Sequence, residues 1–197
     1  MILNFPEGDF EGYIFDCDGT LIDSMPLHYR AWSASFLHHN APFEFSADRF
    51  YASAGVPDRE TVAALNEEYG CTLDADSIHH HKLEFFTKHL HELKAVPAVA
   101  DVVRSVHGRS PISVASGSDL SLINPSLRIV ELHHFFEIIV TPADVERGKP
   151  APDMFLLAAE KMGVAPEKCL VFEDGQAGIE AANAAGMQSV FVPSRPK

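Results

Sequence analysis

The chain of 197 residues contains few cysteines. Only Cys17, Cys71 and Cys169 are present, and they lie far apart in the sequence. An odd number of widely spaced cysteines does not predict a disulfide framework or a zinc site. We therefore expect a protein of a reducing compartment, the cytoplasm.

Long apolar runs and positive charge are also scarce. No run of about 18 or more apolar residues occurs, so no membrane partner is expected. The first residues, MILNFPEGDFEG, lack a basic stretch followed by a long apolar one, so no secretory signal is predicted. The formal net charge of −13 argues against nucleic acid as a partner. An anionic substrate would have to meet local cations or a metal ion.

Short apolar runs predict five buried strands. They lie at residues 11–15, around 112–115, and at 137–140, 169–172 and 189–192. Helical patterns between them end near glycines 108, 163 and 186, where a helix C-terminus favours glycine. Strands that alternate with helices predict an α/β fold with a parallel sheet of βαβ units.

Residues 25–94 interrupt this alternation with helical patterns only. The sequence therefore predicts a core domain made of residues 1–24 and 95–197, and a helical cap domain made of residues 25–94. An insertion of this kind is suited to act as a lid.

Acidic side chains follow two of the predicted strands. Asp16 and Asp18 come directly after the first, and Glu173 and Asp174 after the fourth. The carboxyl ends of parallel strands share one edge of a sheet, where ligands bind. One carboxylate there can attack phosphorus while another transfers protons, and a hard cation such as Mg²⁺ suits the oxygen-rich surroundings. A simple turn or capping role is the alternative.

Two further motifs carry groups that can hold a phosphoryl oxygen. Ser116 offers a hydroxyl and Gly117 a backbone amide, directly after the second predicted strand. Lys149 precedes a proline-rich stretch, which suits a fixed cation. An ordinary turn and a solvated lysine are the alternatives.

The four motifs together resemble those of the haloacid dehalogenase-like superfamily. They are DCDGTLIDS, VASGS, GKPAPDMF and VFEDGQAGIEAANAAGM, in the family's order. By this resemblance Asp16 is the nucleophile and Asp18 the general acid and base. Ser116, Gly117 and Lys149 would bind the transferring phosphoryl group.

The resemblance also implies a metal site and a fold. Asp16, the backbone carbonyl of Asp18, Glu173 and Asp174 would surround Mg²⁺. The implied architecture is a Rossmann-like parallel-sheet core with an inserted helical cap.

Within the superfamily the chain looks like the β-phosphoglucomutase-like branch. His28, Arg59 and Lys82 occupy positions similar to that branch's substrate-binding cap residues. A half-exposed helix histidine and two solvated cations are the alternatives. The triple histidine at 79–81 favours a solvated helix face over a metal site, because successive helical residues point in different directions.

The predicted function is a Mg²⁺-dependent phosphatase of small phosphorylated sugars or sugar acids, acting through an aspartyl-phosphate. The alternative is a β-phosphoglucomutase. Mutase-like relatives usually carry a run resembling SKN after the second-motif serine, whereas this chain has GSDLS, which favours the phosphatase. A non-catalytic interaction protein is disfavoured, since the expected catalytic side chains are all present. The partner would be a small phosphorylated metabolite, and a monomer is expected.

Overall fold

A computed structural model describes residues 1–53 and 56–194. The chain divides into two compact units, which are described separately. The core unit comprises Met1–Asp23 and Leu93–Lys197, and the cap unit comprises Ser24–Glu92.

The core unit is built on a five-stranded parallel sheet with the order β3-β2-β1-β4-β5. The strands are β1 (Gly12–Phe15), β2 (Ile112–Ala115), β3 (Ile138–Val140), β4 (Cys169–Glu173) and β5 (Gln188–Phe191). The predicted α/β, Rossmann-like fold is confirmed, and the strand ends agree with the predicted ones to about one residue.

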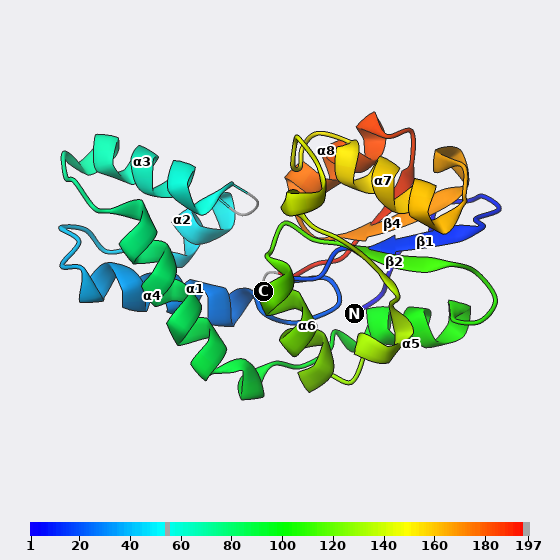
Figure 1. The fold of residues 1–197 in the computed structure, drawn as a ribbon, viewed down its shortest axis with the longest axis horizontal. Coiled ribbons are helices and arrows are strands. Elements are labelled where there is room, and N and C mark those ends of the chain that lie inside the picture. Colours follow the sequence, from blue (N-terminus) through cyan, green and yellow to red (C-terminus); the bar gives the residue numbers. More distant parts are fainter. Residues whose placement is uncertain (54–55, 195–197) are drawn as a thin grey trace. The chain divides into compact units, whose positions relative to one another are not determined.

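Helices cover both faces of this sheet (Figure 1). One face carries α7 (Asp153–Met162) and α8 (Gln176–Ala184), and the other carries α5 (Pro97–Val106) and α6 (Leu120–Ile129). Short 3₁₀ turns complete the connections at η2 (His133–Phe135), η3 (Pro142–Asp144) and η4 (Pro166–Lys168).

Burial on both faces explains why the strands read as continuous apolar runs. Ile14 and Val171 pack with Phe155 of α7 on one face. Phe15 stacks on Phe172, with ring centroids 4.8 Å apart. These side chains are fully buried, so the strands hold the residues at their carboxyl ends in fixed positions.

Helix α6 was not predicted from the sequence. It contains Pro125, which cannot donate a backbone hydrogen bond in a helix interior. The buried apolar side chains Ile123 and Leu127 lie one turn apart and pack the helix onto the unit. Tertiary packing here outweighs the unfavourable propensity of proline.

Among its described residues the cap unit contains helices and connecting loops but no strands. It contains α1 (Met25–His38), α2 (Ala47–Ala52), α3 (Asp58–Tyr69), α4 (Ala75–Lys88) and the 3₁₀ turn η1 (Leu90–Glu92). Helices α1 and α4 pack side by side (Figure 1). Its core is largely aromatic and aliphatic, and includes Trp32, Phe36, Phe45, Phe50, Leu65 and Ile78.

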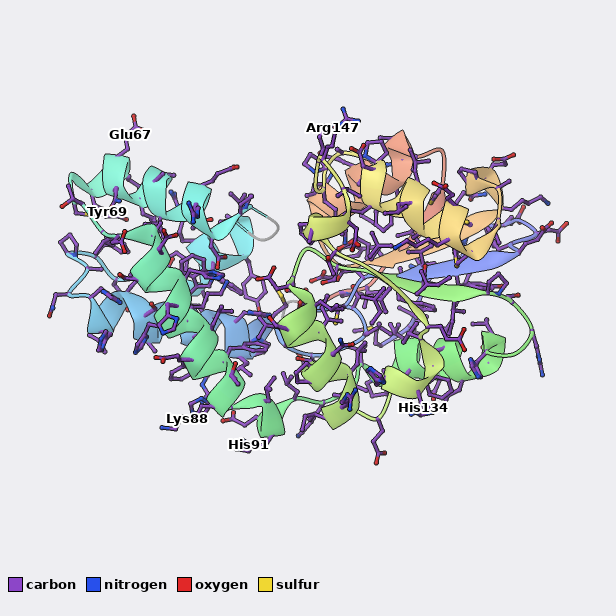
Figure 2. All side chains as sticks on the ribbon, in the orientation of Figure 1. Glu67, Tyr69, Lys88, His91, His134 and Arg147 are labelled. Atoms are coloured by element: carbon purple, nitrogen blue, oxygen red, sulfur yellow. The ribbon has the colours of Figure 1, made fainter. Side chains whose placement is uncertain are left out.

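Polar side chains point outward from both units (Figure 2). Glu67 and Lys88 do so on the cap unit, and Arg147 on the core unit, where it pairs with Asp153 at 2.7 Å. Among the described residues no helix has the length and apolar character needed to cross a membrane.

Candidate active site

The carboxyl ends of three neighbouring strands bring the predicted core residues together. Asp16 follows β1, Ser116 follows β2, and Glu173 ends β4. Strand β1 pairs with both β2 and β4, so these residues share one edge of the sheet. All three are buried.

Lys149 joins two of the acids. Its Nζ donates to Asp16 Oδ1 at 2.7 Å and to Glu173 Oε2 at 2.6 Å. Its side chain is only 9% exposed, and Nζ lies 5.0 Å from the centroid of the Phe155 ring. The alternative of a solvated lysine therefore does not hold. Burial opposes the charge of Lys149, but both carboxylates outweigh it and raise the lysine pKa.

Glu173 is held at both of its oxygens. Oε2 accepts from Lys149, and Oε1 accepts from the backbone amides of Asp174 (3.2 Å) and Gly175 (3.0 Å). Helix α8 approaches so closely that a Cβ on Gly178 would lie 2.0 Å from Glu173 Oε2. Only glycine at 178 leaves room for this carboxylate in its observed position.

Asp174 is packed in a similar way against the turn after β1. Gly19 has a φ of +85°, and a Cβ there would lie 2.1 Å from Asp174 Oδ2. The backbone therefore requires glycine both for its conformation and for this close approach. Burial and the nearby charge of Glu173 raise the pKa of Asp174 to about 7, and a hydrogen bond from Ser194 opposes that rise.

Burial and nearby acids also disfavour the ionised form of Asp16. Burial raises its pKa well above the ordinary value, repulsion from Glu173 and Asp174 adds to this, and Lys149 opposes it. Burial and the repulsion between these acids thus outweigh the opposing effect of Lys149 on the pKa of Asp16.

A second hydrogen-bonded group positions Asp18. The hydroxyl of Ser118 donates to Asp18 Oδ2 at 2.6 Å, and the Ser118 amide donates to Ser116 Oγ at 3.2 Å. The loop after β2 is thereby tied to the loop after β1. Gly117 lies between these serines, and a Cβ there would meet no atom within 4 Å, so crowding does not require this glycine.

The donor set suits a hard cation. Oxygen atoms of Asp16, Glu173 and Asp174 all lie within 4.8 Å of one another. Carboxylate oxygens are the ligands that Mg²⁺ prefers, and a divalent charge would relieve the repulsion that raises two of these pKa values. The residues present therefore fit Mg²⁺.

Each predicted cap residue has its own surroundings within the cap unit. His28 is buried and stacks on Phe86, with centroids 4.2 Å apart. Arg59 is exposed and pairs with Asp76 at 2.8 Å. Residues 54 and 55, in the segment preceding Arg59, lie outside the described residues.

The side chain of Lys82 is only 11% exposed, so the alternative of a solvated cation does not hold. Its Nζ donates to Asp58 at 2.7 and 2.8 Å and lies 4.6 Å from the centroid of the Trp32 ring. His79 also bonds to Asp58, at 2.8 Å. Burial disfavours ionisation of Asp58, but Lys82 and His79 outweigh it and lower the Asp58 pKa.

Sequence reasoning missed three residues that order these groups. Ser118 orients Asp18, Gly178 makes room for Glu173, and Asp58 fixes Lys82. Ser118 lies in the motif GSDLS and Gly178 in the run QAGIE, but neither pattern indicates which residue the side chain or backbone contacts. No local signal links Asp58 to Lys82, because they belong to different helices.

Comparison with known proteins identifies the family. The model of the haloacid dehalogenase-like hydrolases matches residues 10–186. The chain belongs to this family.

The chain is 38% identical over 183 residues to fructose-1-phosphate phosphatase YqaB of Escherichia coli, covering 93% of this chain and 96% of that protein. It is 31% identical to the phosphorylated carbohydrates phosphatase of Thermotoga maritima, covering 92% and 84%. The structure of CbbY from Rhodobacter sphaeroides in complex with phosphate is similar, with a TM-score of 0.81, 25% identity, and coverage of 91% and 84%.

These matches confirm the predicted family and the predicted enzyme class, a phosphoric monoester hydrolase. The cytoplasmic location and the monomeric state stay predictions.

Proposed function

We propose that this protein is a Mg²⁺-dependent phosphatase that hydrolyses small phosphorylated sugars or sugar acids. The observation that carries the proposal is the buried group in which Lys149 bridges Asp16 and Glu173 beside Asp174. The names of the relatives, fructose-1-phosphate phosphatase and phosphorylated carbohydrates phosphatase, support this class of substrate.

In the proposed reaction the carboxylate of Asp16 attacks phosphorus and forms an aspartyl-phosphate. Lys149 already binds Asp16 Oδ1, so this ammonium stands beside the reacting carboxylate. There it would fix the orientation of Asp16 and neutralise charge on the transferring group. Ser116 and Gly117 would donate to phosphoryl oxygens.

Asp18 would protonate the departing sugar oxygen, and its carboxylate would then take a proton from water. The water oxygen attacks phosphorus, which releases phosphate and regenerates Asp16. The hydrogen bond from Ser118 holds the Asp18 side chain in one orientation. We propose that Ser118 positions this acid and base.

Asp16, Glu173, Asp174 and the backbone carbonyl of Asp18 would hold Mg²⁺. When bound, the ion would offset the negative charge of these acids and of the phosphoryl group. The glycines at 19 and 178 would keep the carboxylates of Asp174 and Glu173 in place for it.

Residues 25–94 would act as the cap domain over a core of residues 1–24 and 95–197. Arg59 and Lys82 would meet the distal anionic or hydroxyl end of the substrate, and His28 would lie near the transferred group. The side chain of Lys82 is already ordered by its pairing with Asp58, so contact with a substrate would cost it little further conformational entropy.

The alternative is a β-phosphoglucomutase, in which a second sugar hydroxyl rather than water accepts the phosphoryl group. A screen of phosphorylated sugars and sugar acids with Mg²⁺ decides between them when it measures both free phosphate and isomerised sugar phosphate. Release of phosphate without isomer supports the phosphatase. Isomer as the main product supports the mutase, and no turnover of any phosphorylated compound contradicts both.

Chelation is expected to abolish activity. Without a divalent cation, Asp16, Glu173 and Asp174 would repel a phosphate dianion. Dialysis against EDTA should remove turnover, added Mg²⁺ should restore it, and Ca²⁺ should inhibit, because its larger and more flexible shell disturbs the in-line geometry. Phosphate release measured before and after readdition checks this, and full turnover after exhaustive chelation would refute the metal requirement.

Arg59→Ala is expected to lower activity on the preferred sugar phosphate far more than on a small generic phosphate ester. A remote contact supplies binding energy for closing the cap, and a small ester lacks the group that makes this contact. Arg59 is exposed, so the free energy of unfolding should change by no more than about 0.5 kcal/mol. The measurement is kcat/KM for both compounds.

The matched control is Arg49→Ala, which removes another exposed arginine of the same unit, paired with Glu68. It should leave both activities unchanged. If Arg59→Ala scales both activities equally, or affects neither, the assignment of Arg59 to substrate recognition is wrong.

A further inference from the structure

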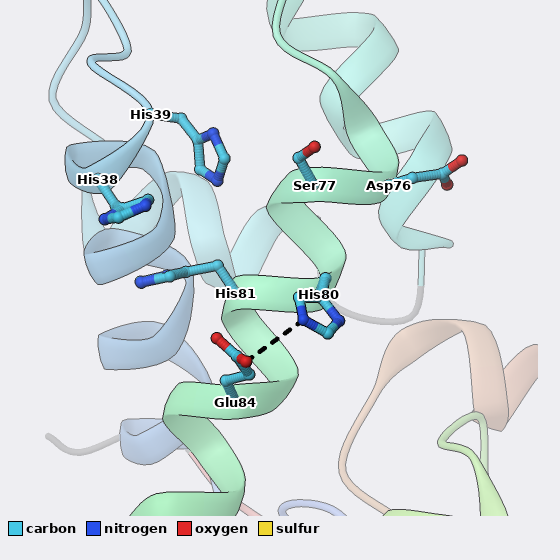
Figure 3. A pocket seen from close by; sticks show the side chains of 7 residues that line it. All are labelled: His38, His39, Asp76, Ser77, His80, His81 and Glu84. Carbon is cyan, nitrogen blue, oxygen red and sulfur yellow. Dashed lines mark ion pairs between the residues drawn. The ribbon is translucent and has the colours of Figure 1, made fainter.

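Four histidines gather where two helices of the cap unit meet. His38 is the last residue of α1 and His39 caps that helix, while His80 and His81 lie in α4. With Asp76, Ser77 and Glu84 they line a surface pocket of about 460 Å³ (Figure 3). The pair His38 and His39 is far in sequence from the pair His80 and His81. The proposed phosphatase chemistry uses none of the four.

The ring arrangement brings three of these histidines into contact. The rings of His38 and His81 stack in parallel, with centroids 4.2 Å apart and an interplanar angle of 12°. The ring of His39 stands nearly perpendicular to that of His81, at 6.0 Å. Figure 3 shows the His81 side chain reaching across from α4 toward His38.

The neighbours of His81 in sequence are engaged elsewhere. His79 bonds to Asp58, and His80 pairs with Glu84 at 3.3 Å. The three consecutive histidines thus point in different directions, as helical geometry predicts. A ligand set drawn from this region is therefore formed across the helices, and not by the HHH run itself.

His81 also carries an unusual buried atom. Its Nδ1 is shielded from solvent and has no hydrogen-bond partner among the described residues. Burial lowers the pKa of His81, and the nearby His38 and His39 lower it further. At neutral pH the ring is therefore uncharged and keeps a lone pair for a ligand.

We propose that His38, His39 and His81 bind a divalent transition-metal ion such as Zn²⁺ on the cap unit. Neutral imidazole suits Zn²⁺, Cu²⁺ and Ni²⁺, whereas the carboxylate site of the core unit suits Mg²⁺. Asp76 and Glu84 line the same pocket, where they pair with Arg59 and His80, and their negative charge would favour a cation there.

Binding requires the side chains to turn. Among the described residues, the acids of the core unit form the one group of three whose ligand atoms lie within 4.8 Å of one another. His38 is exposed at the end of α1, so its ring can leave the stack and direct a nitrogen toward His81. The bound ion would then tie the end of α1 to the middle of α4.

Calorimetric titration of the whole protein with Zn²⁺, in excess Mg²⁺, tests this proposal. Loss of even an outer partner of a metal ligand weakens affinity about 10–100-fold. Joint replacement His38→Gln and His81→Gln should therefore weaken one Zn²⁺ site by about 100-fold or more. Any Zn²⁺ that binds at the core acids does so in both the wild type and the double variant, so it does not affect the comparison.

The matched control is His134→Gln, which removes an exposed histidine of the core unit (Figure 2). It should leave the Zn²⁺ isotherm unchanged. Co²⁺ provides a second measurement, since nitrogen ligation in a four-coordinate site gives visible absorption that the double variant should lack. His39→Gln, checked by circular dichroism, serves as a milder variant should the double replacement fail to fold.

Identical Zn²⁺ isotherms for the wild type and a folded His38, His39 or His81 variant would overturn the proposal. An equal loss of Zn²⁺ affinity in the His134→Gln control would do so as well, because it would indicate adventitious binding to surface histidines only.

Discussion

Asp16→Asn is expected to lower turnover of the preferred sugar phosphate by about 10⁴-fold or more, the scale seen when a catalytic nucleophile is removed. An amide has nearly the shape of a carboxylate but cannot attack phosphorus to form an acyl-phosphate. The carbonyl oxygen of asparagine still accepts the hydrogen bond that Lys149 donates to Asp16 Oδ1. The measurement is single-turnover phosphate release with saturating substrate and Mg²⁺.

The same variant is expected to be at least as stable as the wild type in the absence of metal. Burial, Glu173 and Asp174 raise the pKa of Asp16 in the folded protein above its value of about 3.9 in the unfolded chain. Such a group contributes stability at low pH, and this contribution is lost as the pH rises. Near pH 7 the folded protein bears the cost of an ionised, buried Asp16 beside two other acids. Asparagine removes this cost, so the free energy of unfolding near pH 7 should stay equal or increase.

Asp9→Asn is the matched control, because Asp9 is an exposed aspartate of the same unit. It should leave both turnover and stability unchanged. Retained turnover in a clean preparation of Asp16→Asn would remove Asp16 from the role of nucleophile. A large loss of stability in that variant would contradict the account of its charge.

The sequence was sufficient to place the core acids because the relevant signals are local. A short apolar run followed by Asp16, or by Glu173, predicts a buried strand with an acid at its carboxyl end. Parallel pairing then brings the strand ends to one edge, whatever the details of packing. The structure confirms the five strands and their order along the chain.

The contacts that order this site were not predictable, because they are set by tertiary packing. Lys149 and Glu173 are 24 residues apart, and Ser118 and Asp18 are 100 apart. Nothing in either local pattern specifies which oxygen accepts which proton. Helix α6 was missed for a related reason: burial of Ile123 and Leu127 offsets the effect of Pro125.

The cap residues show the same limit. Arg59 and Lys82 both looked like cations for a substrate or for solvent. Arg59 is exposed beside Asp76, whereas Lys82 is held by Asp58 and Trp32. Two basic residues in similar helical patterns thus differ in exposure and in partners, and only the fold distinguishes them.

Lys149→Met is expected to lower the free energy of unfolding by about 3 kcal/mol near pH 8, as is typical when one partner of a buried ion pair is removed. Lys149 is 9% exposed and is bound to both Asp16 and Glu173. Methionine has a similar length and an apolar side chain, so the change removes the ammonium, together with its contact to the Phe155 ring, and leaves most of the side-chain volume. Turnover should also fall, by about 10²–10³-fold, if Lys149 neutralises the transferring phosphoryl group.

The loss of stability should depend on pH in a defined direction. Lys149 lowers the pKa of Asp16, so its removal leaves that pKa even further above the unfolded value of about 3.9. A raised carboxyl pKa contributes stability that is present at low pH and is lost as the pH rises. The difference between wild type and variant should therefore be small near pH 4 and widen toward pH 8.

Denaturant unfolding of both proteins across this range, in EDTA, gives the comparison. Lys168→Met is the matched control, since Lys168 is half-exposed and lies 3.7 Å from Glu11. It should change stability by less than about 1 kcal/mol, with little dependence on pH. If Lys149→Met loses the same stability at pH 4 as at pH 8, the effect comes from packing. The bridge between Asp16 and Glu173 is then not what stabilises this edge of the sheet.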